Sequence, residues 1–380
     1  MAPERPTSMP TESPESAVRL RYAAAARLPE AALCCPVDYD RRYLEAIPAE
    51  VIEKDYGCGD PSRWLQPGET VLDLGSGTGK IAFIASQVVG PRGRVIGVDM
   101  TDAMLEVARR NAPRVAERIG YANVEFRKGR IQDLGLDLDA VGAELAGRPV
   151  DGADAFLQLH ELAERLRRER PLVADASVDV VVSNCVLNLV DAREKRRLFA
   201  EIHRVLRAGG RAVISDIVCG EDVPDALRRD AELWSGCVSG ALREDRFLQA
   251  FEEAGFRGIR LLKRDAKPWR TVEGIEFRAV TVEAFRGDDL PDDGTPATVV
   301  YKGPFREVVL DGGTRFRRGD RVAVGSRTAG EFGRPPYAGC FEFVEPRGAE
   351  ATAAPAAGLS FRAVPATTTD GGCCGGGACG

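Results

Sequence analysis

A glycine-rich segment, DLGSGTG at residues 73–79, lies between a short apolar run at 71–74 and an apolar run of helical length at 81–89. Its three glycines let the backbone turn sharply and come close to a ligand, because no side chain obstructs the approach. A turn of this kind between a strand and a helix is typical of α/β folds that bind a ligand at the turn. The segment therefore predicts an α/β fold with a ligand site at this point of the chain.

The alternation of strand and helix patterns continues beyond this turn. Further strands are predicted at residues 94–99, 124–129, 178–184 and 211–218, and further helices at 102–110 and 193–207. The strands are apolar along most of their length, which is typical of parallel strands buried on both faces. We therefore expect a doubly wound, mostly parallel sheet.

Changes in composition predict the remaining organisation. An insertion at 134–175 contains an amphipathic helix at 156–170 that we expect to cover the sheet edge. Alternating patterns at 275–286, 297–303 and 321–326 predict a small β-rich C-terminal part. The expected segments are a disordered start (1–16), a helical segment with Cys34, Cys35 and Cys58 (17–68), the core (69–270), the β-rich part (271–346) and a flexible Cys/Gly tail (347–380).

Charge and hydrophobicity exclude several classes of protein. The net charge of −6 argues against a nucleic-acid partner, which would normally meet a basic face. No apolar run approaches the roughly 20 residues that span a bilayer. The apolar stretch at 19–35 is broken by Arg27, Pro29 and Glu30, so we do not interpret it as a signal sequence. The expected compartment is the cytoplasm.

The chain has ten cysteines, and in a reducing compartment we do not expect them to form structural disulfides. No pair has the C-x₂-C spacing of a zinc site, and His160 and His203 are the only histidines. The sulfur is therefore either incidental or serves a softer ligand.

The glycine segment resembles the first motif of class I S-adenosylmethionine-dependent methyltransferases. It differs from the dinucleotide pattern G-x-G-x-x-G in its shorter final spacing and in the preceding acid, Asp73. The resemblance implies a seven-stranded Rossmann-like sheet with S-adenosylmethionine as cofactor. In it Asp99 would bind the ribose hydroxyls, and Met100 and Ile131 would contact adenine. The implied cofactor-binding residues are Asp73, Gly75, Ser76, Gly77, Gly79, Asp99, Met100, Ile131 and Asn184. A nicotinamide cofactor is the alternative.

Three cysteines are predicted to meet at the cofactor. Cys185 follows the strand at 178–184, and the carboxyl ends of parallel strands form the ligand crevice. Cys237 follows the last parallel strand, and Cys58 precedes the first by about a dozen residues, within reach of the same crevice. Each could be a small buried hydrophobe. Together, three converging thiolates suit a soft three-coordinate centre such as trivalent arsenic.

The segments that carry these cysteines resemble those of arsenite methyltransferases. They read DYGCG at 55–59, SNCVLNL at 183–189 and WSGCVSGAL at 234–242, and the resemblance covers about residues 30–305. It implies that Cys58, Cys185 and Cys237 bind As(III), and that Cys34 or Cys35 is a redox partner. The insertion at 134–175 is longer than expected for this family.

The implied reaction begins with arsenite that enters as a thiol adduct and passes to the three thiolates. The arsenic lone pair then attacks the methyl carbon of the sulfonium in line, so no general base is required. Glutathione or thioredoxin would restore oxidised thiols. The alternatives are a methyltransferase for an organic nucleophile and a non-catalytic metalloid-binding protein. Cys373, Cys374 and Cys379 would either collect the metalloid or belong to a merely mobile tail.

Overall fold

The computed structural model describes residues 13–28, 30, 37–54, 56–287, 295–310 and 313–344. The chain divides into two compact units, residues 1–289 and 290–380, and each is described by itself. The tail at 347–380 lies outside the described residues, and so do Cys34, Cys35, Cys373, Cys374 and Cys379.

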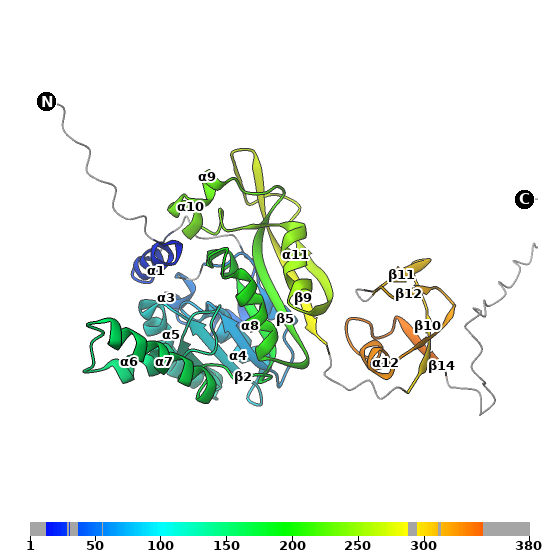
Figure 1. Ribbon diagram of the computed structural model, residues 1–380, viewed down its shortest axis with the longest axis horizontal. Coiled ribbons are helices and arrows are strands. Elements are labelled where there is room, and N and C mark those ends of the chain that lie inside the picture. The colour runs from blue at the N-terminus through cyan, green and yellow to red at the C-terminus, as the bar shows by residue number, and fades with distance from the viewer. Residues whose placement is uncertain are drawn as a thin grey trace, which may run out of the picture. The chain divides into compact units, whose positions relative to one another are not determined.

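A nine-stranded sheet forms the centre of the first unit (Figure 1). Seven strands follow one another in the order β3-β2-β1-β4-β5-β9-β7, while β6 pairs with β5 and β8 with β9. Strands β1 to β6 pair in parallel, and β9 runs antiparallel to β5, β7 and β8. The bounds are β1 (Thr70–Leu74), β2 (Arg94–Asp99), β3 (Val124–Lys128), β4 (Val178–Asn184), β5 (Leu206–Cys219), β6 (Leu242–Arg243), β7 (Phe256–Arg264), β8 (Arg270–Val272) and β9 (Ile275–Arg286). The predicted mostly parallel α/β sheet is confirmed.

Helices precede the sheet and connect its strands. The bounds are α1 (Pro14–Ala25), α2 (Arg41–Leu44), α3 (Ala49–Ile52), η2 (Pro61–Trp64), α4 (Lys80–Val89), α5 (Asp102–Ile119), α6 (Leu138–Leu145), α7 (Ala153–Glu169), η3 (Leu187–Leu189), α8 (Lys195–Val205), α9 (Asp225–Arg228), α10 (Ala231–Ser235) and α11 (Glu244–Glu253). Helix α1 begins inside the segment predicted to be disordered, and Ser13 caps it by accepting a hydrogen bond from the Ser16 N–H. Among the described residues, no helix combines the length and apolarity needed to cross a membrane.

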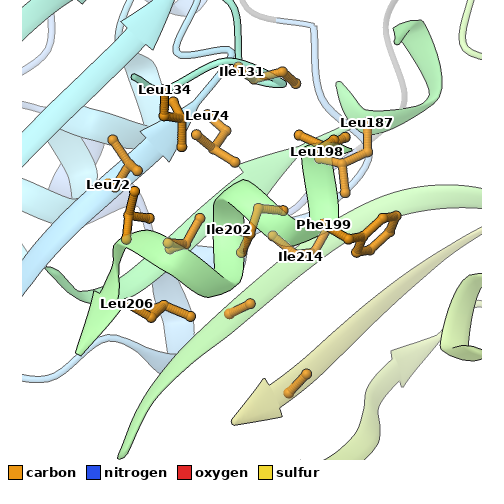
Figure 2. Packing of buried hydrophobic residues seen from close by; sticks show 14 of the residues in the cluster. Leu72, Leu74, Ile131, Leu134, Leu187, Leu198, Phe199, Ile202, Leu206 and Ile214 are labelled. Atoms are coloured by element: carbon orange, nitrogen blue, oxygen red, sulfur yellow. The ribbon is translucent and has the colours of Figure 1, made fainter. Parts of the chain in front are cut away.

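Alternating side chains of the strands enter two apolar cores, one on each face of the sheet. Val71 and Val95 lie in a core that α4 and α5 cover. Leu72 and Leu74 lie in the opposite core, against α8 and α11. Figure 2 shows Leu72 and Leu74 across from Ile202 and Phe199 of α8. Helices on both faces explain why the parallel strands are apolar along most of their length.

The insertion follows the edge strand β3. Helix α6 contacts β3, and Asp139 at its start forms an ion pair of 2.6 Å with Arg109 of α5. Arg167 of α7 pairs with Asp133 at 2.7 Å, just after β3. The insertion therefore packs along the sheet edge, as a peripheral cover would.

Strand β9 corrects the predicted C-terminal part. The sequence pattern assigns residues 275–286 to a β-rich part that begins at 271. The structure instead places this strand inside the large sheet, with Val282 opposite Ile214 of β5 and Leu261 of β7. The antiparallel direction agrees with the pattern, but alternation along one strand does not identify the strands that it pairs with.

The second unit is small and rich in strands. Its bounds are β10 (Ala297–Tyr301), β11 (Glu307–Val309), β12 (Arg315–Arg317), β13 (Arg321–Val324), α12 (Ser326–Phe332) and β14 (Phe341–Val344). Strands β13-β10-β14 form one antiparallel sheet, and β11 pairs with β12. Phe316, Phe332 and Phe341 fill its core, with the rings of Phe332 and Phe341 stacked 3.9 Å apart.

Candidate active site

The glycine turn after β1 adopts a backbone that other residues rarely take. Gly75, Gly77 and Gly79 have φ angles of 66°, 52° and 95°. A Cβ atom on Gly75 would lie 2.4 Å from Cγ1 of Val186. Gly79 is the N-cap residue of α4. The turn therefore brings main chain, rather than side chains, to the carboxyl end of β1.

Asp99 connects the end of β2 to this turn. Its carboxylate accepts hydrogen bonds from the Gly77 N–H at 3.0 Å and the Thr101 N–H at 2.8 Å. Burial raises the pKa of Asp99 above its usual value, although these hydrogen bonds oppose the shift. The carboxylate thus lies fixed beside the glycine turn.

A cavity of about 920 Å³, which includes the space at its open mouth, lies at the carboxyl ends of β1, β2 and β4. Eight predicted cofactor-binding residues line it: Asp73, Gly75, Ser76, Gly77, Asp99, Met100, Ile131 and Asn184. Gly79 is not in the lining, because it begins α4 and packs against Phe126 instead. The hydroxyl of Ser76 is buried and has no hydrogen-bond partner among the described residues. It is therefore available to a bound ligand.

The three predicted thiols share one apolar cluster at this cavity. Cys58, Cys185 and Cys237 are all buried in it, and Cys185 lines the cavity. The thiol of Cys237 donates a hydrogen bond to the carbonyl of Cys185 at 3.0 Å. Residues that lie 127 and 52 positions apart in sequence thus share one buried cluster, and Cys185 connects it to the cavity.

Two of these cysteines have strained backbones. The φ angles are 65° at Cys185 and 60° at Cys237, in the left-handed region that favours glycine. Such a conformation costs roughly 1–2 kcal/mol for other residues. Strained residues persist where the surrounding structure fixes them, and they concentrate at functional sites.

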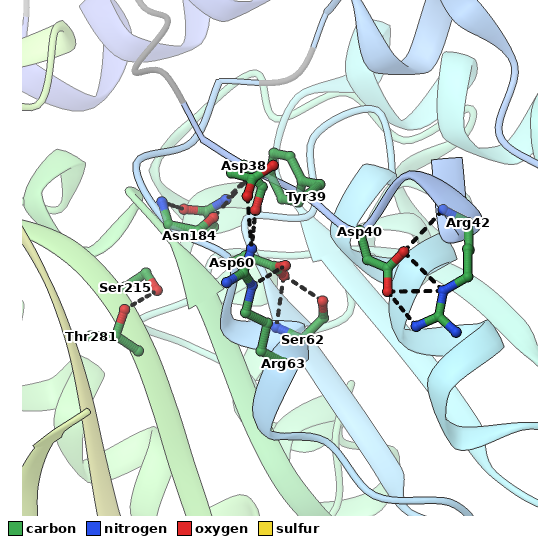
Figure 3. A network of polar contacts seen from close by, with 11 residues as sticks. Asp38, Tyr39, Asp40, Arg42, Asp60, Ser62, Arg63, Asn184, Ser215 and Thr281 are labelled. Atoms are coloured by element: carbon green, nitrogen blue, oxygen red, sulfur yellow. Dashed lines mark hydrogen bonds and ion pairs between the residues drawn. The ribbon is translucent and has the colours of Figure 1, made fainter. Parts of the chain in front are cut away.

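Asn184 fixes the Cys58 segment against β4. Its side-chain oxygen accepts hydrogen bonds from the N–H groups of Cys58 and Gly59, both at 3.0 Å. Its amide donates to the Tyr39 hydroxyl at 3.2 Å (Figure 3). A Cβ on Gly57 would lie 2.0 Å from the Asn184 amide nitrogen, so glycine is needed there. Asn184 therefore holds a thiol segment as well as lining the cavity.

Known proteins are similar to this chain in sequence and in fold. A family described as "Methyltransferase domain" matches residues 65–143 and 163–255, and a domain of unknown function matches 293–370. Arsenite methyltransferases of Mus musculus and Aquipseudomonas alcaligenes are 31% and 32% identical to this chain. The matches cover 80% and 79% of this chain, and 74% and 80% of the relatives.

The chain belongs to the arsenite methyltransferase family.

Two further relatives agree with this assignment. An arsenite methyltransferase of Halobacterium salinarum is 42% identical over 71% of this chain, which spans only 56% of that relative's length. The crystal structure of an arsenic (III) S-adenosylmethionine methyltransferase from Chlamydomonas reinhardtii is 29% identical, with a TM-score of 0.54. That comparison covers 83% of this chain and 98% of the other.

S-adenosylmethionine is the cofactor of this arsenite methyltransferase, and the lining of the cavity offers groups for each part of the molecule. The main chain at the glycine turn and the free Ser76 hydroxyl could bind its amino-acid end. The fixed Asp99 carboxylate offers acceptors for a diol. Met100, Met104 and Ile131 supply apolar walls. Met104 was not predicted, although it lies in the first turn of α5 on the buried face of that helix.

The arsenite methyltransferase thiols are difficult to ionise without a ligand. The hydrogen bond with Cys237 lowers the pKa of Cys185, but the interaction with Cys58 and burial outweigh it, so that this pKa lies well above its usual value. Hydrogen bonding with Cys185 and burial likewise raise the pKa of Cys237. A bound soft ion would have to displace these protons.

Sequence reasoning missed Asp216, an acid beside the thiols. It lies in β5, fully buried, and one of its oxygens and the sulfurs of Cys58 and Cys185 all lie within 4.8 Å of one another. Burial raises the pKa of Asp216 to about 6. The available signal was an acid in the middle of an otherwise apolar strand, AVISDIV at 212–218.

Helix α1 covers the thiol cluster and was not predicted to contribute to the site. Val18 and Tyr22 line the cavity, and the Tyr22 hydroxyl lies 4.0 Å from the sulfur of Cys237. Arg21 donates to the Glu232 carbonyl and to the Ser235 hydroxyl, both at 2.9 Å, which ties α1 to α10 (Figure 1). Helix α1 therefore packs directly against the Cys237 thiol.

Proposed function

We propose that this chain transfers a methyl group from S-adenosylmethionine to trivalent arsenic bound by the thiolates of Cys58, Cys185 and Cys237. The observation that carries the proposal is the burial of these three thiols in one cluster, with Cys185 lining the cofactor cavity. Three thiolates suit a soft trivalent ion, and membership of the arsenite methyltransferase family supports arsenite as the substrate.

The residues around the thiols suit ligand exchange. Arsenic would arrive as a thiol adduct, and each protein thiol that replaces a carrier thiol would pass its proton to that carrier. The raised pKa values of Cys185 and Cys237 keep them protonated until arsenic binds. The bound complex is neutral, because three thiolates balance one trivalent arsenic.

Methyl transfer would rest on proximity and alignment. The cofactor supplies an electrophilic methyl group on a sulfonium sulfur. Arsenic held by three sulfurs keeps its lone pair and has no proton to lose, so the site needs no general base. The two histidines of the chain, His160 and His203, lie outside the cavity lining.

Further thiols would complete the catalytic cycle. Cys34 or Cys35 would be the partner of an active-site cysteine when a pentavalent product is reduced, and glutathione or thioredoxin would restore the thiols. We further propose that the protein acts in the cytoplasm, in the detoxification of arsenic.

The test is methylarsenic production from arsenite, S-adenosylmethionine and glutathione, measured by chromatography with arsenic detection. Cys58→Ser, Cys185→Ser and Cys237→Ser should each lose activity, by at least about 100-fold, because one sulfur ligand is gone. Cys219→Ser is the matched control, since Cys219 is a buried cysteine of the same cluster and has no proposed ligand role. Methylation that survives in both Cys58→Ser and Cys237→Ser would refute the proposal. Turnover of an organic acceptor without arsenic would favour the organic-nucleophile alternative.

A further inference from the structure

Asp216 has no role in the proposed chemistry, yet it is the buried carboxylate next to two of the proposed arsenic ligands. It follows Ser215 in β5, whose carbonyl accepts the Cys185 N–H at 2.8 Å. Its side chain is completely buried. An oxygen of Asp216 lies within 4.8 Å of the sulfurs of both Cys58 and Cys185. A charge at this place acts on the reacting centre through a medium of low polarity.

Four N–H groups bind this carboxylate. One oxygen accepts from the Leu187 N–H at 2.9 Å and the Asn188 N–H at 3.3 Å. The other accepts from the Asn188 side-chain amide at 2.8 Å and the Ile217 N–H at 2.7 Å. All four partners are donors, an arrangement that suits an ionised carboxylate. With these positions filled, Asp216 is poorly placed to bind arsenic or another metal itself.

The same hydrogen bonds fix the charge in space. Leu187 and Asn188 belong to the turn η3 that follows Cys185, so Asp216 also anchors the strained Cys185 backbone. Hydrogen bonding with Cys185 and burial contribute most to the raised pKa of Cys237, and the negative charge of Asp216 adds to it. The charge therefore acts at the third thiol too.

Methyl transfer changes the charge of the arsenic centre. This step rests on the proposed function. A bond forms between arsenic and the methyl carbon with the arsenic lone pair, while the carbon–sulfur bond of the sulfonium breaks and its electron pair stays on sulfur. The sulfonium loses its positive charge, and the neutral arsenic trithiolate gains it. A fixed negative charge beside the thiolates favours this shift.

We propose that Asp216 is a positioning residue whose fixed carboxylate stabilises the positive charge that develops on thiolate-bound arsenic during methyl transfer. A preoriented charge that needs no reorganisation can contribute a large part of a rate enhancement. Lys195, a buried cation nearby, donates to the Leu187 carbonyl at 2.7 Å and thus supports the same turn.

The test compares binding with chemistry in the Asp216→Asn variant of the full chain. As(III) binding, followed by tryptophan fluorescence without cofactor, should stay within about threefold of the unmodified protein. The single-turnover rate of methyl transfer should fall by about 10- to 100-fold, in the range found when one preoriented electrostatic partner is lost. Asp222→Asn is the control, because Asp222 is an exposed acid that follows the same strand. A rate within twofold of the unmodified protein at full arsenic occupancy would overturn the proposal.

A second pair of variants separates charge from packing if Asp216→Asn does not fold. Asp216→Glu and Asp216→Gln add the same volume and differ in charge. Per bound arsenic, the glutamate variant should be at least about tenfold faster, and equal rates would overturn the inference. Failure of the proposed function has a different signature. In that case the unmodified protein binds no As(III), or Cys58→Ser and Cys237→Ser both methylate it normally, and both proposals fall.

Discussion

At the scale of single residues, the site depends on glycines packed so closely against side chains that a Cβ atom would clash. Gly57 and Gly59 flank Cys58, and a Cβ at either position would lie within 2.5 Å of an atom of Asn184 or Ser215. The hydroxyls of Ser215 in β5 and Thr281 in β9 form a hydrogen bond of 2.8 Å (Figure 3). The main chain on both sides of Cys58 is thus packed against the side chains of Asn184 and Ser215, which fixes the position of Cys58.

Gly57→Ala should therefore displace Asn184 and loosen the Cys58 segment. We expect a loss of about 1–3 kcal/mol in the free energy of unfolding, as for other overpacked sites. As(III) affinity should fall by at least about tenfold, because Asn184 orients the Cys58 N–H. Fluorescence titration and denaturant unfolding measure the two effects. Gly142→Ala is the control, since a Cβ at that helical position meets no atom within 4 Å. Equal behaviour of the two variants would contradict the packing argument.

Asp216 should also give stability a dependence on pH. Its pKa is about 6 in the folded protein, above its ordinary value of 3.8, so the folded state binds the proton more tightly. The resulting stabilisation is complete below the unfolded pKa and is lost as pH rises through about 6. The quantity to measure is the free energy of unfolding of the unmodified protein minus that of Asp216→Asn. Between pH 4 and 6 this difference should fall by up to about 1.4 kcal/mol per pH unit. A difference that stays constant over this range would show that the shift is wrong.

Sequence patterns predicted most of the candidate residues but not their full environment. Cys185 and Asp99 could be placed because each ends an apolar strand, and strand ends of a parallel sheet share one edge. Tyr22 and Asp216 could not. The contact of Tyr22 depends on how α1 folds back over α10, and the neighbours of Asp216 come from separate loops. Gly79 was assigned to the cofactor, whereas its conformation serves the start of α4.

At the scale of elements, α1 packs against α10 and places the Tyr22 hydroxyl 4.0 Å from the sulfur of Cys237. It is held over α10 by the two hydrogen bonds of Arg21, and Arg21 also forms an ion pair with Glu30. Both ends of the helix have further partners, since Glu15 pairs with Arg130 at 2.5 Å and the Tyr56 hydroxyl donates to the Ala25 carbonyl at 3.1 Å.

Arg21→Ala should increase local opening of α1. Loss of about 1–2 kcal/mol of local stability raises the open population by roughly 5- to 30-fold. Alkylation of Cys237, followed by mass spectrometry, should accelerate to the same extent. Arg19→Ala on the exposed side of the same helix is the control and should leave the rate unchanged. No acceleration in Arg21→Ala would mean that another route reaches the thiol.

Element boundaries show where sequence reasoning succeeds. The predicted bounds of the strands at 94–99 and 178–184 match β2 and β4, because polar or glycine residues end each apolar run. The predicted helix at 193–207 ends earlier, at Val205, since β5 begins directly at Leu206. Residues 207–209 at the start of β5 are exposed, so no apolar run marks the beginning of the strand.

At the scale of the whole molecule, every described residue of the candidate site lies in the first compact unit, residues 1–289. A chain that ends at residue 289 should therefore fold and bind S-adenosylmethionine within about threefold of the full chain's affinity, because the cavity and its cores remain complete. Isothermal titration measures this affinity. Loss of cofactor binding in the shortened chain, with its circular dichroism unchanged, would show that the second unit contributes to the site.

X-ray absorption at the arsenic edge measures the number of sulfur atoms bound to arsenic. With one equivalent of As(III) bound to the full chain, we expect three sulfur neighbours around arsenic. Cys58→Ser, Cys185→Ser and Cys237→Ser should each reduce this number to two, with an oxygen neighbour in place of the third, while Cys219→Ser should keep three. Three sulfur neighbours that persist when Cys58, Cys185 and Cys237 are all replaced by serine would show that these thiols do not bind arsenic.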